Sequence, residues 1–413
     1  MLLDILNQID SIVWGPWLLV LLVGTGIWLT FRLTLLQVVK LPRALKLIFF
    51  ARNKGEGDID SFKALCTALA ATVGTGNIAG GPMYYIEMGL GKKWKPLAVL
   101  FAFFGCMVAL LGSGTTTQMN AIISSVEAGF GISTYITCAV ITVLVAIITF
   151  GGLQSIAKAA EKIVPAMAVI YFVITVIFLA LNAGGLPGAI SQVFTGAFSG
   201  TAAAGGFAGA GVMLAMRSGI ARGLFSNESG LGSAPIVAAA AKTKWPAEQG
   251  LISMTGTFID TIIICTLTGL TIIVSGQWLG DTNGAELTQN AFAVTYGGFA
   301  PILLTVSLAL FAFTTILGWN YYGERCWEYL FGTKSILFYR VLFLVILASA
   351  AFLKLESIWA LADIVNGLMA IPNLIALLGL TGVIVAETKK YFEHLEIRDA
   401  KLKAYKARRI GKR

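Results

Sequence analysis

The strongest constraint on the fold of this chain is a series of long apolar runs that recur along most of its length. Each run is close to the ~20 residues that a helix needs to cross a lipid bilayer. Only 12% of the 413 residues are charged, against about 25% in a soluble globular chain. The sequence therefore predicts an all-α polytopic membrane protein. The runs lie at 14–36, 96–120, 134–152, 163–183, 250–275, 298–320, 336–353 and 369–387.

Two further runs, 64–80 and 203–241, are rich in Gly, Ala, Ser and Thr rather than Leu and Phe. Small residues allow helices to pack closely, and they tolerate breaks in the helix where protein rather than lipid surrounds the backbone. We therefore expect both runs to lie inside the bundle. Together the runs predict one transmembrane domain of about ten spans over residues 1–390, followed by a basic tail at 391–413.

The distribution of basic residues predicts the orientation of the chain. Lys and Arg are concentrated in alternate short loops and in the tail, which places these segments in the cytoplasm, the C-terminus among them, and the N-terminus outside. The net charge of +9 is explained by these loops, so we expect no nucleic-acid partner. The tail is expected to face anionic lipid headgroups. The segment 1–10 lacks a basic start and a cleavage site, so we expect no removable signal peptide.

One segment breaks this alternation. The loop at 40–63 and the loop at 92–95 are both basic, so both are expected in the cytoplasm, and an even number of crossings should join them. The intervening residues provide one weak span at most. Either one crossing is missing, or the segment enters the membrane and returns on the same side.

The residue types argue against an enzyme. The five cysteines show no paired spacing, and the single histidine, His394, lies in the charged tail. Hydrolytic metal sites and Ser-His or Cys-His nucleophiles therefore lack their usual groups. We expect no transition-metal site and no cofactor apart from a coupling ion.

The first polar motif interrupts the run 64–80 with the glycine-containing sequence Gly74, Thr75, Gly76 and Asn77. It lacks the preceding strand of a dinucleotide fold and the Gly-Lys-Ser/Thr of a phosphate loop. In a membrane helix, such glycines let the backbone unwind, which frees N–H groups for a carboxylate and C=O groups for a cation. Simple close packing of helices is an equally good interpretation of this motif alone.

The second motif, at 216–235, places charged and amide side chains within the run 203–241. Such groups are costly in a bilayer unless they pair or line water. One interpretation is a cytoplasmic helix end at which Arg217 or Arg222 pairs with Glu228. Asn227 is a better ligand candidate because its amide both donates and accepts hydrogen bonds without carrying charge.

The third motif, at 313–324, combines hydroxyl and aromatic side chains. Thr315 and Trp319 are four residues apart and share a helix face, which suits a pocket for a small solute. The alternative is an aromatic belt at the membrane surface, which Tyr321 and Tyr322 fit better. On the span 96–120, Gln118 is expected either to face the same cavity or to cap a helix end.

Four segments resemble one known family, the alanine/glycine:cation symporters. They are AATVGTGNIAG at 70–80, GPMYYIEMGL at 81–90, GIARGLFSNESGLGSAP at 219–235 and GWNYYGE at 318–324. The likeness extends from about residue 14 to 390. It implies a sodium-coupled carrier of alanine or glycine in the cytoplasmic (inner) membrane. It also implies a leading helix at 14–36 and two inverted five-helix repeats, at 64–183 and 203–387.

The resemblance also implies roles for single residues. Gly74, Thr75, Gly76 and Asn77 would hold the carboxylate of the amino acid. Asn227, Thr315 and Trp319 would help to line the substrate pocket, to which we add Gln118 from its position on the span 96–120. The carbonyl of Val73 and the hydroxyl of Thr314 would bind Na⁺.

The chain departs from the family pattern at one junction. In the family, the rest of a broken helix and a further full span separate the GNIAG and GGPMYYI segments, whereas here Gly80 runs directly into Gly81. We interpret this as an internal deletion that leaves the first repeat about one span short. Two outcomes are open: a sodium-coupled symporter, or a transport-deficient member of the family that keeps only the scaffold.

Overall fold

The computed structural model describes residues 2–50, 58–69, 81–198, 219–223, 226–282, 284–352 and 355–410. Within these ranges all named elements are helices, and an isolated bridge joins Ile59 to Ala241. Six helices of the described part are long and apolar enough to cross a membrane, or seven if the bent pair formed by the first two helices counts as one span. The expectation of an all-α polytopic membrane protein is therefore confirmed.

Two of the elements are π-helical, η1 (Ile86–Leu90) and η4 (Phe258–Cys265). The α-helices are α1 (Leu2–Val13), α2 (Pro16–Arg32), α3 (Leu36–Val39), α4 (Leu41–Phe50), α5 (Ser61–Leu69), α6 (Pro82–Tyr85), α7 (Lys95–Leu111), α8 (Thr116–Phe130), α9 (Thr134–Phe150), α10 (Gly152–Leu181), α11 (Leu186–Phe198), α13 (Ala234–Ala238), α14 (Pro246–Thr257), α15 (Thr266–Ser275), α16 (Gly284–Tyr296), α17 (Ala300–Phe331), α18 (Ile336–Ser349), α19 (Leu355–Gly379) and α20 (Thr381–Ile410).

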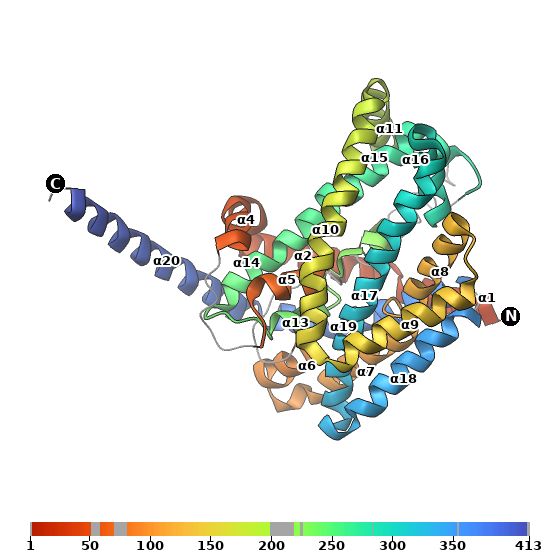
Figure 1. Cartoon of the computed structure of the whole chain (residues 1–413). Helices are drawn as coiled ribbons and strands as arrows, with labels where there is room; N and C mark the ends of the chain where they lie inside the picture. The colour runs from red at the N-terminus through yellow and green to blue at the C-terminus, as the bar shows by residue number, and fades with distance from the viewer. Residues whose placement is uncertain are drawn as a thin grey trace.

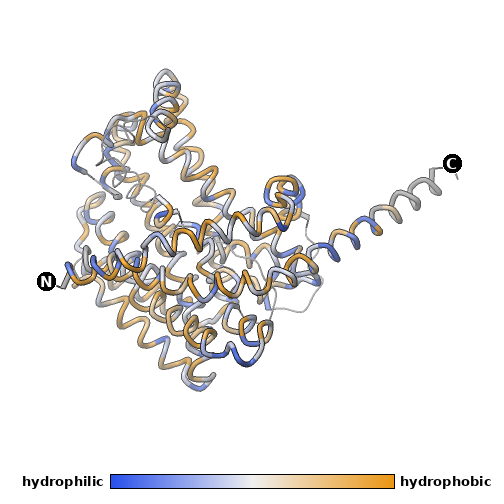
Figure 2. Tube along the Cα trace, turned by 180° about the vertical axis from the view of Figure 1, so that it is seen from behind, coloured by the Kyte–Doolittle hydropathy of each residue, from blue (hydrophilic) through white to orange (hydrophobic). Residues whose placement is uncertain are grey.

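The centre of the bundle is formed by α17, which packs against α7, α8 and α10, and by α19, which packs against α7 (Figure 1). The last helix, α20, leaves this bundle and projects away from it (Figure 1). In the coloured part of α20, hydrophilic residues alternate with hydrophobic ones, whereas hydrophobic residues dominate the bundle helices (Figure 2).

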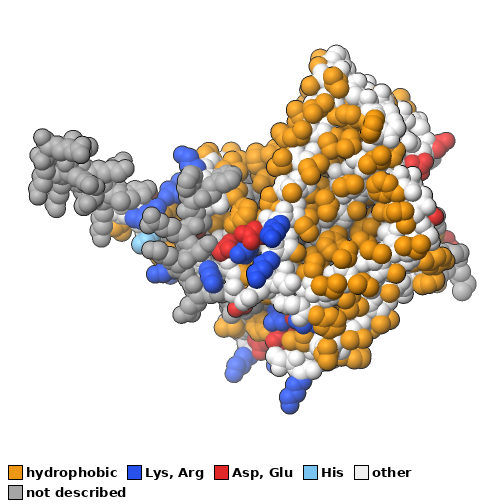
Figure 3. All heavy atoms as spheres, in the orientation of Figure 1, with side chains coloured by type: hydrophobic (Ala, Val, Ile, Leu, Met, Phe, Trp, Pro, Cys, Tyr) orange, Lys and Arg blue, Asp and Glu red, His pale blue; other side chains and the backbone are white. Residues whose placement is uncertain are grey.

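The surface of the bundle carries a broad apolar region (Figure 3). Exposed side chains such as Ile147, Val169 and Val345 belong to different helices, α9, α10 and α18. Such a surface would be unfavourable in water, whereas lipid tails are as apolar as these side chains. On the same face, Lys and Arg gather mainly toward one end of the bundle (Figure 3). We refer to this end, where α4 and the start of α20 lie, as the basic end.

Small residues bring α7 and α17 into close contact. A Cβ atom at Gly105 would lie 2.6 Å from the sulfur of Cys326, and one at Gly323 would collide with Ala109 and Tyr339. Two helices that approach this closely fix the position of α17 relative to the rest of the bundle.

Two apolar runs differ from the expected spans. The run 96–120 is interrupted, since α7 ends at Leu111 and α8 begins at Thr116. The run 369–387 is divided at Leu380, and α19 begins well before it, at Leu355. Asp363 and Asn366 lower the hydropathy of the first half of α19, so the length of the apolar run does not predict this half as a helix. Asn366 is nevertheless buried in the bundle.

Candidate functional site

The two runs rich in small residues meet in the structure. The segment just before the first run is joined to the end of the second by backbone hydrogen bonds, from Asp58 N–H to the carbonyl of Ala240 (2.9 Å) and from Lys242 N–H to the carbonyl of Ile59 (2.7 Å). The helix α5, which opens the first run, also packs against α13, which lies at the end of the second. The predicted ligands Val73, Gly74, Thr75, Gly76 and Asn77 follow α5 but lie outside the described residues.

The second run contains a break in its helix. Residues 226–227 are helical, the segment 228–233 is not, and α13 begins at Ala234. Three residues in the break have left-handed backbone angles: Glu228 (φ 50°), Gly230 (φ 82°) and Gly232 (φ 89°). The two glycines adopt such angles at little cost, whereas Glu228 pays about 1–3 kcal/mol. Surrounding contacts must therefore hold Glu228 in place.

The Glu228 side chain is buried and bonded within the bundle. The hydroxyl of Ser233 donates a hydrogen bond to its carboxyl group, and the side chain of Trp319 lies next to it. The predicted pairing of Arg222 with Glu228 is wrong. Arg222 instead pairs with Asp363 of α19 and lies over the ring of Trp359, at 5.2 Å from its centroid. Arg222 therefore does not neutralise Glu228, whose carboxyl group accepts a hydrogen bond from Ser233 instead. Arg217 lies outside the described residues.

Asn227 lies beside a second, partly buried carboxyl group that the sequence analysis missed. Its amide donates a hydrogen bond to the hydroxyl of Thr261 (2.5 Å), and the neighbouring Ser226 donates one to Asp260 (2.8 Å). Both acceptors belong to the π-helical stretch η4, and π-helical turns are frequent at functional sites. The available signal was a lone acidic residue in the middle of the apolar run 250–275.

A small cavity opens beside Asp260. Its volume is about 260 Å³, which is enough for several waters or a small solute, because a water occupies about 30 Å³. Apart from Asp260, its polar lining consists mainly of hydroxyl and amide groups from α8, α15, α16 and α17. These groups include Ser125, Thr268, Thr288, Gln289 and Ser307.

The predicted residues of α17 face two sides of the helix. The hydroxyl of Thr314 lies against α10, with the sulfur of Met167 at 3.8 Å. Thr315 bonds back to the carbonyl of Phe311 (2.9 Å), while Trp319 is 1% exposed and packs edge-on against Tyr322. Tyr321 and Tyr322 are also buried, so the interpretation of these aromatic residues as a surface belt is wrong.

Trp319 packs against a break that the sequence analysis did not identify. A Cβ atom at Gly114, between α7 and α8, would lie 2.8 Å from Cγ of Trp319. In the same break, Ser113 donates a hydrogen bond to Asn366 of α19 (3.3 Å). Gln118 donates one to the carbonyl of Ser113 (3.1 Å), so its amide holds the break rather than capping α8, which has no side-chain cap. The Gly, Ser and Thr residues of 112–117 barely lower the hydropathy of the run 96–120, so its sequence predicts one continuous span.

A neighbouring amide has no partner among the described residues. Asn320 is 1% exposed, and neither its nitrogen nor its oxygen forms a hydrogen bond there. Buried amides are nearly always bonded, and an exception calls for an explanation such as a bound water or ligand. Asn320 therefore adds a free donor and acceptor beside Trp319.

Such breaks in apolar helices are typical of membrane transport proteins when they surround buried carboxyl, amide and hydroxyl groups. Comparison with known proteins identifies the family. A profile of the sodium:alanine symporter family matches residues 1–80 and 79–404. The chain belongs to the sodium:alanine symporter family, whose members are transporters rather than enzymes.

Individual relatives cover nearly the whole chain. It is 48% identical over 444 residues to an uncharacterized transporter of Haemophilus influenzae, with 95% of this chain and 97% of the relative aligned. It is 43% identical to a sodium/alanine symporter of Methanococcus maripaludis, with 94% and 97% aligned. A probable sodium/glutamine symporter of Bacillus subtilis is 33% identical, with 92% and 89% aligned.

The comparisons also support the predicted deletion. The family profile matches in two pieces that meet at residues 79–80, as expected if a segment of the family is absent between Gly80 and Gly81. In addition, the 444 aligned residues exceed the 413 residues of this chain, so that relative has residues without a counterpart here. The comparisons do not support a loss of transport.

Proposed function

We propose that this protein carries out sodium-coupled symport of alanine or glycine across the cytoplasmic membrane. Family membership, with a sodium/alanine symporter at 43% identity, supports this proposal most strongly. The buried polar centre between α8, η4 and α17 supports it independently. The orientation that follows from the basic loops places the N-terminus outside and the C-terminal tail in the cytoplasm.

The amino acid is held in this proposal by backbone and by neutral side chains. Gly74, Thr75, Gly76 and Asn77 offer N–H groups to its carboxylate. Asn227, Thr315 and Trp319 line the pocket, with Gln118 at the start of α8. The close contact between Trp319 and Gly114 leaves little room on that side, which favours a short side chain such as that of alanine or glycine.

Sodium requires oxygen ligands, and we assign it to the side of α17 that faces α10. Thr314 lies on that side, beside Met167 of α10. The helix α5 also packs against α10, so the chain that leads from α5 to Val73 begins near this side of α17. Glu228 and Asp260 add carboxyl groups to the region. Carboxyl groups inside a bilayer attract cations and mark ion pathways.

The experiment for this function measures alanine binding to the purified full chain in detergent, with Na⁺ or with K⁺ at equal ionic strength. If one site couples the ion and the amino acid, Na⁺ should tighten alanine binding about tenfold or more, within the usual 5–150-fold range of coupling. Glycine should compete for this site, and glutamine, which is larger, should not. The same alanine affinity in both salts would refute sodium coupling, and effective competition by glutamine would refute the assigned substrate class.

A further inference from the structure

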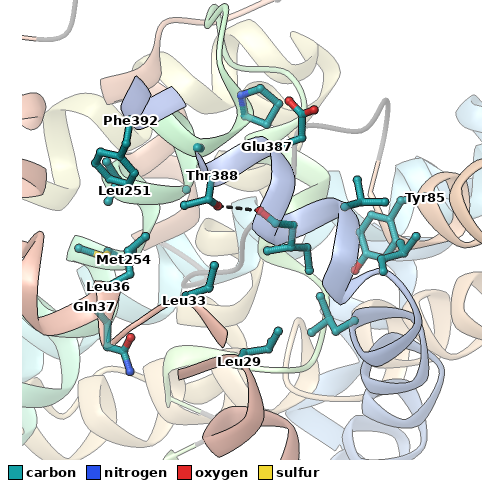
Figure 4. Close-up of a pocket in the computed structure, with 17 residues that line it drawn as sticks. Leu29, Leu33, Leu36, Gln37, Tyr85, Leu251, Met254, Glu387, Thr388 and Phe392 are labelled. Carbon is teal, nitrogen blue, oxygen red and sulfur yellow. Dashed lines mark hydrogen bonds between the residues drawn. The ribbon is translucent and has the colours of Figure 1, made fainter. Parts of the chain in front are cut away.

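An apolar cavity lies at the basic end, separate from the polar centre (Figure 4). Its volume is about 240 Å³, and it lies between the end of α2, the start of α14 and the junction of α19 with α20. Most of its lining is aliphatic or aromatic. Representative residues are Leu29, Leu33, Leu251, Met254, Leu377 and Ile384. The hydroxyl of Thr388 donates a hydrogen bond to the carbonyl of Ile384 (2.7 Å), so its proton is not available to a ligand in the cavity.

A second cavity, of about 530 Å³, adjoins the first and is charged. Leu33, Leu36, Thr388 and Phe392 line both cavities. The charged side chains of the second cavity have both signs: Arg32, Lys40 and Lys389 are basic, and Glu393 and Glu396 are acidic. One continuous groove therefore leads from an apolar interior to a charged mouth.

The basic groups at this mouth form no ion pair with any described residue. Arg32 instead lies over the ring of Trp28 (5.6 Å), and Lys40 lies over the ring of Phe392 (4.7 Å). By contrast, the nearby Lys390 pairs with Glu387 (2.7 Å). Within the described residues, the mouth thus offers basic groups that form no ion pair, with the two glutamates of α20 in the same cavity.

We propose that this groove binds one phospholipid with a primary-amine headgroup. An acyl chain fills the apolar cavity, the phosphate contacts Arg32, Lys40 and Lys389, and the ammonium group donates hydrogen bonds to Glu393 or Glu396. A purely anionic headgroup would meet these glutamates unfavourably, and a choline headgroup has no N–H to donate. Because the groove lies between α2, α14 and α20, the lipid would also fasten α20 to the bundle.

The experiment offers the purified full chain equal amounts of phosphatidylethanolamine, phosphatidylglycerol and phosphatidylcholine of the same acyl composition, and counts bound lipids by native mass spectrometry. Phosphatidylethanolamine should be the main lipid bound. Lys40→Gln should reduce its occupancy about fivefold, the effect of about 1 kcal/mol per basic residue at a membrane surface. Met254→Trp should reduce it as well, by filling the apolar cavity.

Two matched variants serve as controls. Lys158→Gln removes an exposed lysine of α10, and Met88→Trp enlarges an exposed side chain, and neither residue lines the groove. Both should bind phosphatidylethanolamine as the unmodified chain does. Equal or tighter binding of phosphatidylglycerol would overturn the headgroup assignment. Equal losses in Lys40→Gln and Lys158→Gln, or full binding by a folded Met254→Trp, would overturn the site.

Discussion

Trp319→Ala is expected to destabilise the protein and to abolish sodium-driven alanine uptake. The indole is buried between the α7–α8 break at Gly114 and Tyr322, so its removal leaves a large cavity, at a typical cost of about 3–5 kcal/mol. It also removes the indole that lies next to the side chain of Glu228, a residue in a strained backbone conformation. Thermal unfolding in detergent and uptake into proteoliposomes measure the two effects.

Two comparisons separate the packing role of Trp319 from its place in the site. Trp278→Ala removes an indole that is 48% exposed, and it should change neither stability nor uptake. Trp319→Phe keeps most of the packing but loses the indole N–H group beside Glu228, so its stability should recover more than its uptake. A Trp319→Ala protein with normal stability and uptake would show that this residue does not belong to the transport site.

Asn227→Leu is expected to reduce uptake about 100-fold while the protein still folds. The substitution removes the bond from the amide to Thr261 and places an apolar group where the substrate needs a polar one. An unsatisfied buried polar group costs about 1–3 kcal/mol, and tenfold in affinity corresponds to about 1.4 kcal/mol. The concentration dependence of alanine uptake measures the loss.

The control for Asn227 is Asn120→Leu. Asn120 also lies in a membrane helix, but its side chain only accepts a long bond from Ser124 (3.4 Å) near the surface of α8. Uptake by this variant should stay close to that of the unmodified chain. If Asn227→Leu transported alanine equally well, Asn227 would be part of the scaffold and the proposed pocket would need a different wall.

The sequence predicted the class of fold and marked the second small-residue run as unusual, since both depend on local composition. Long apolar runs require membrane helices, and Gly230 and Gly232 permit the left-handed angles observed in the break. The sequence did not predict a role for Asp260 or the break at Gly112–Thr115, because local composition alone does not reveal either of them. Each is a short polar interruption within an apolar run, and its significance depends on partners from distant parts of the chain, such as Ser226 and Trp319.

The deletion was also predictable, because charge alternation and family resemblance pointed to it separately. The structure shows how the new junction is accommodated on its described side. Gly81 has φ 97°, and a Cβ atom there would lie 2.7 Å from a side-chain carbon of Ile236 in α13. A glycine at this position lets the chain turn tightly against the second small-residue run. The junction therefore lies next to the proposed site, where a missing span would affect transport.

The most direct test of sodium-coupled symport is radiolabelled alanine uptake into proteoliposomes with an inward Na⁺ gradient, an inward K⁺ gradient, or no gradient. A second protein, in which the segment missing at Gly80/Gly81 is restored from the Methanococcus maripaludis relative, is measured in parallel. We expect the Na⁺ gradient alone to drive uptake in both proteins, with faster uptake in the restored one. Uptake that is indifferent to Na⁺, or absent from both proteins, would contradict the proposed function.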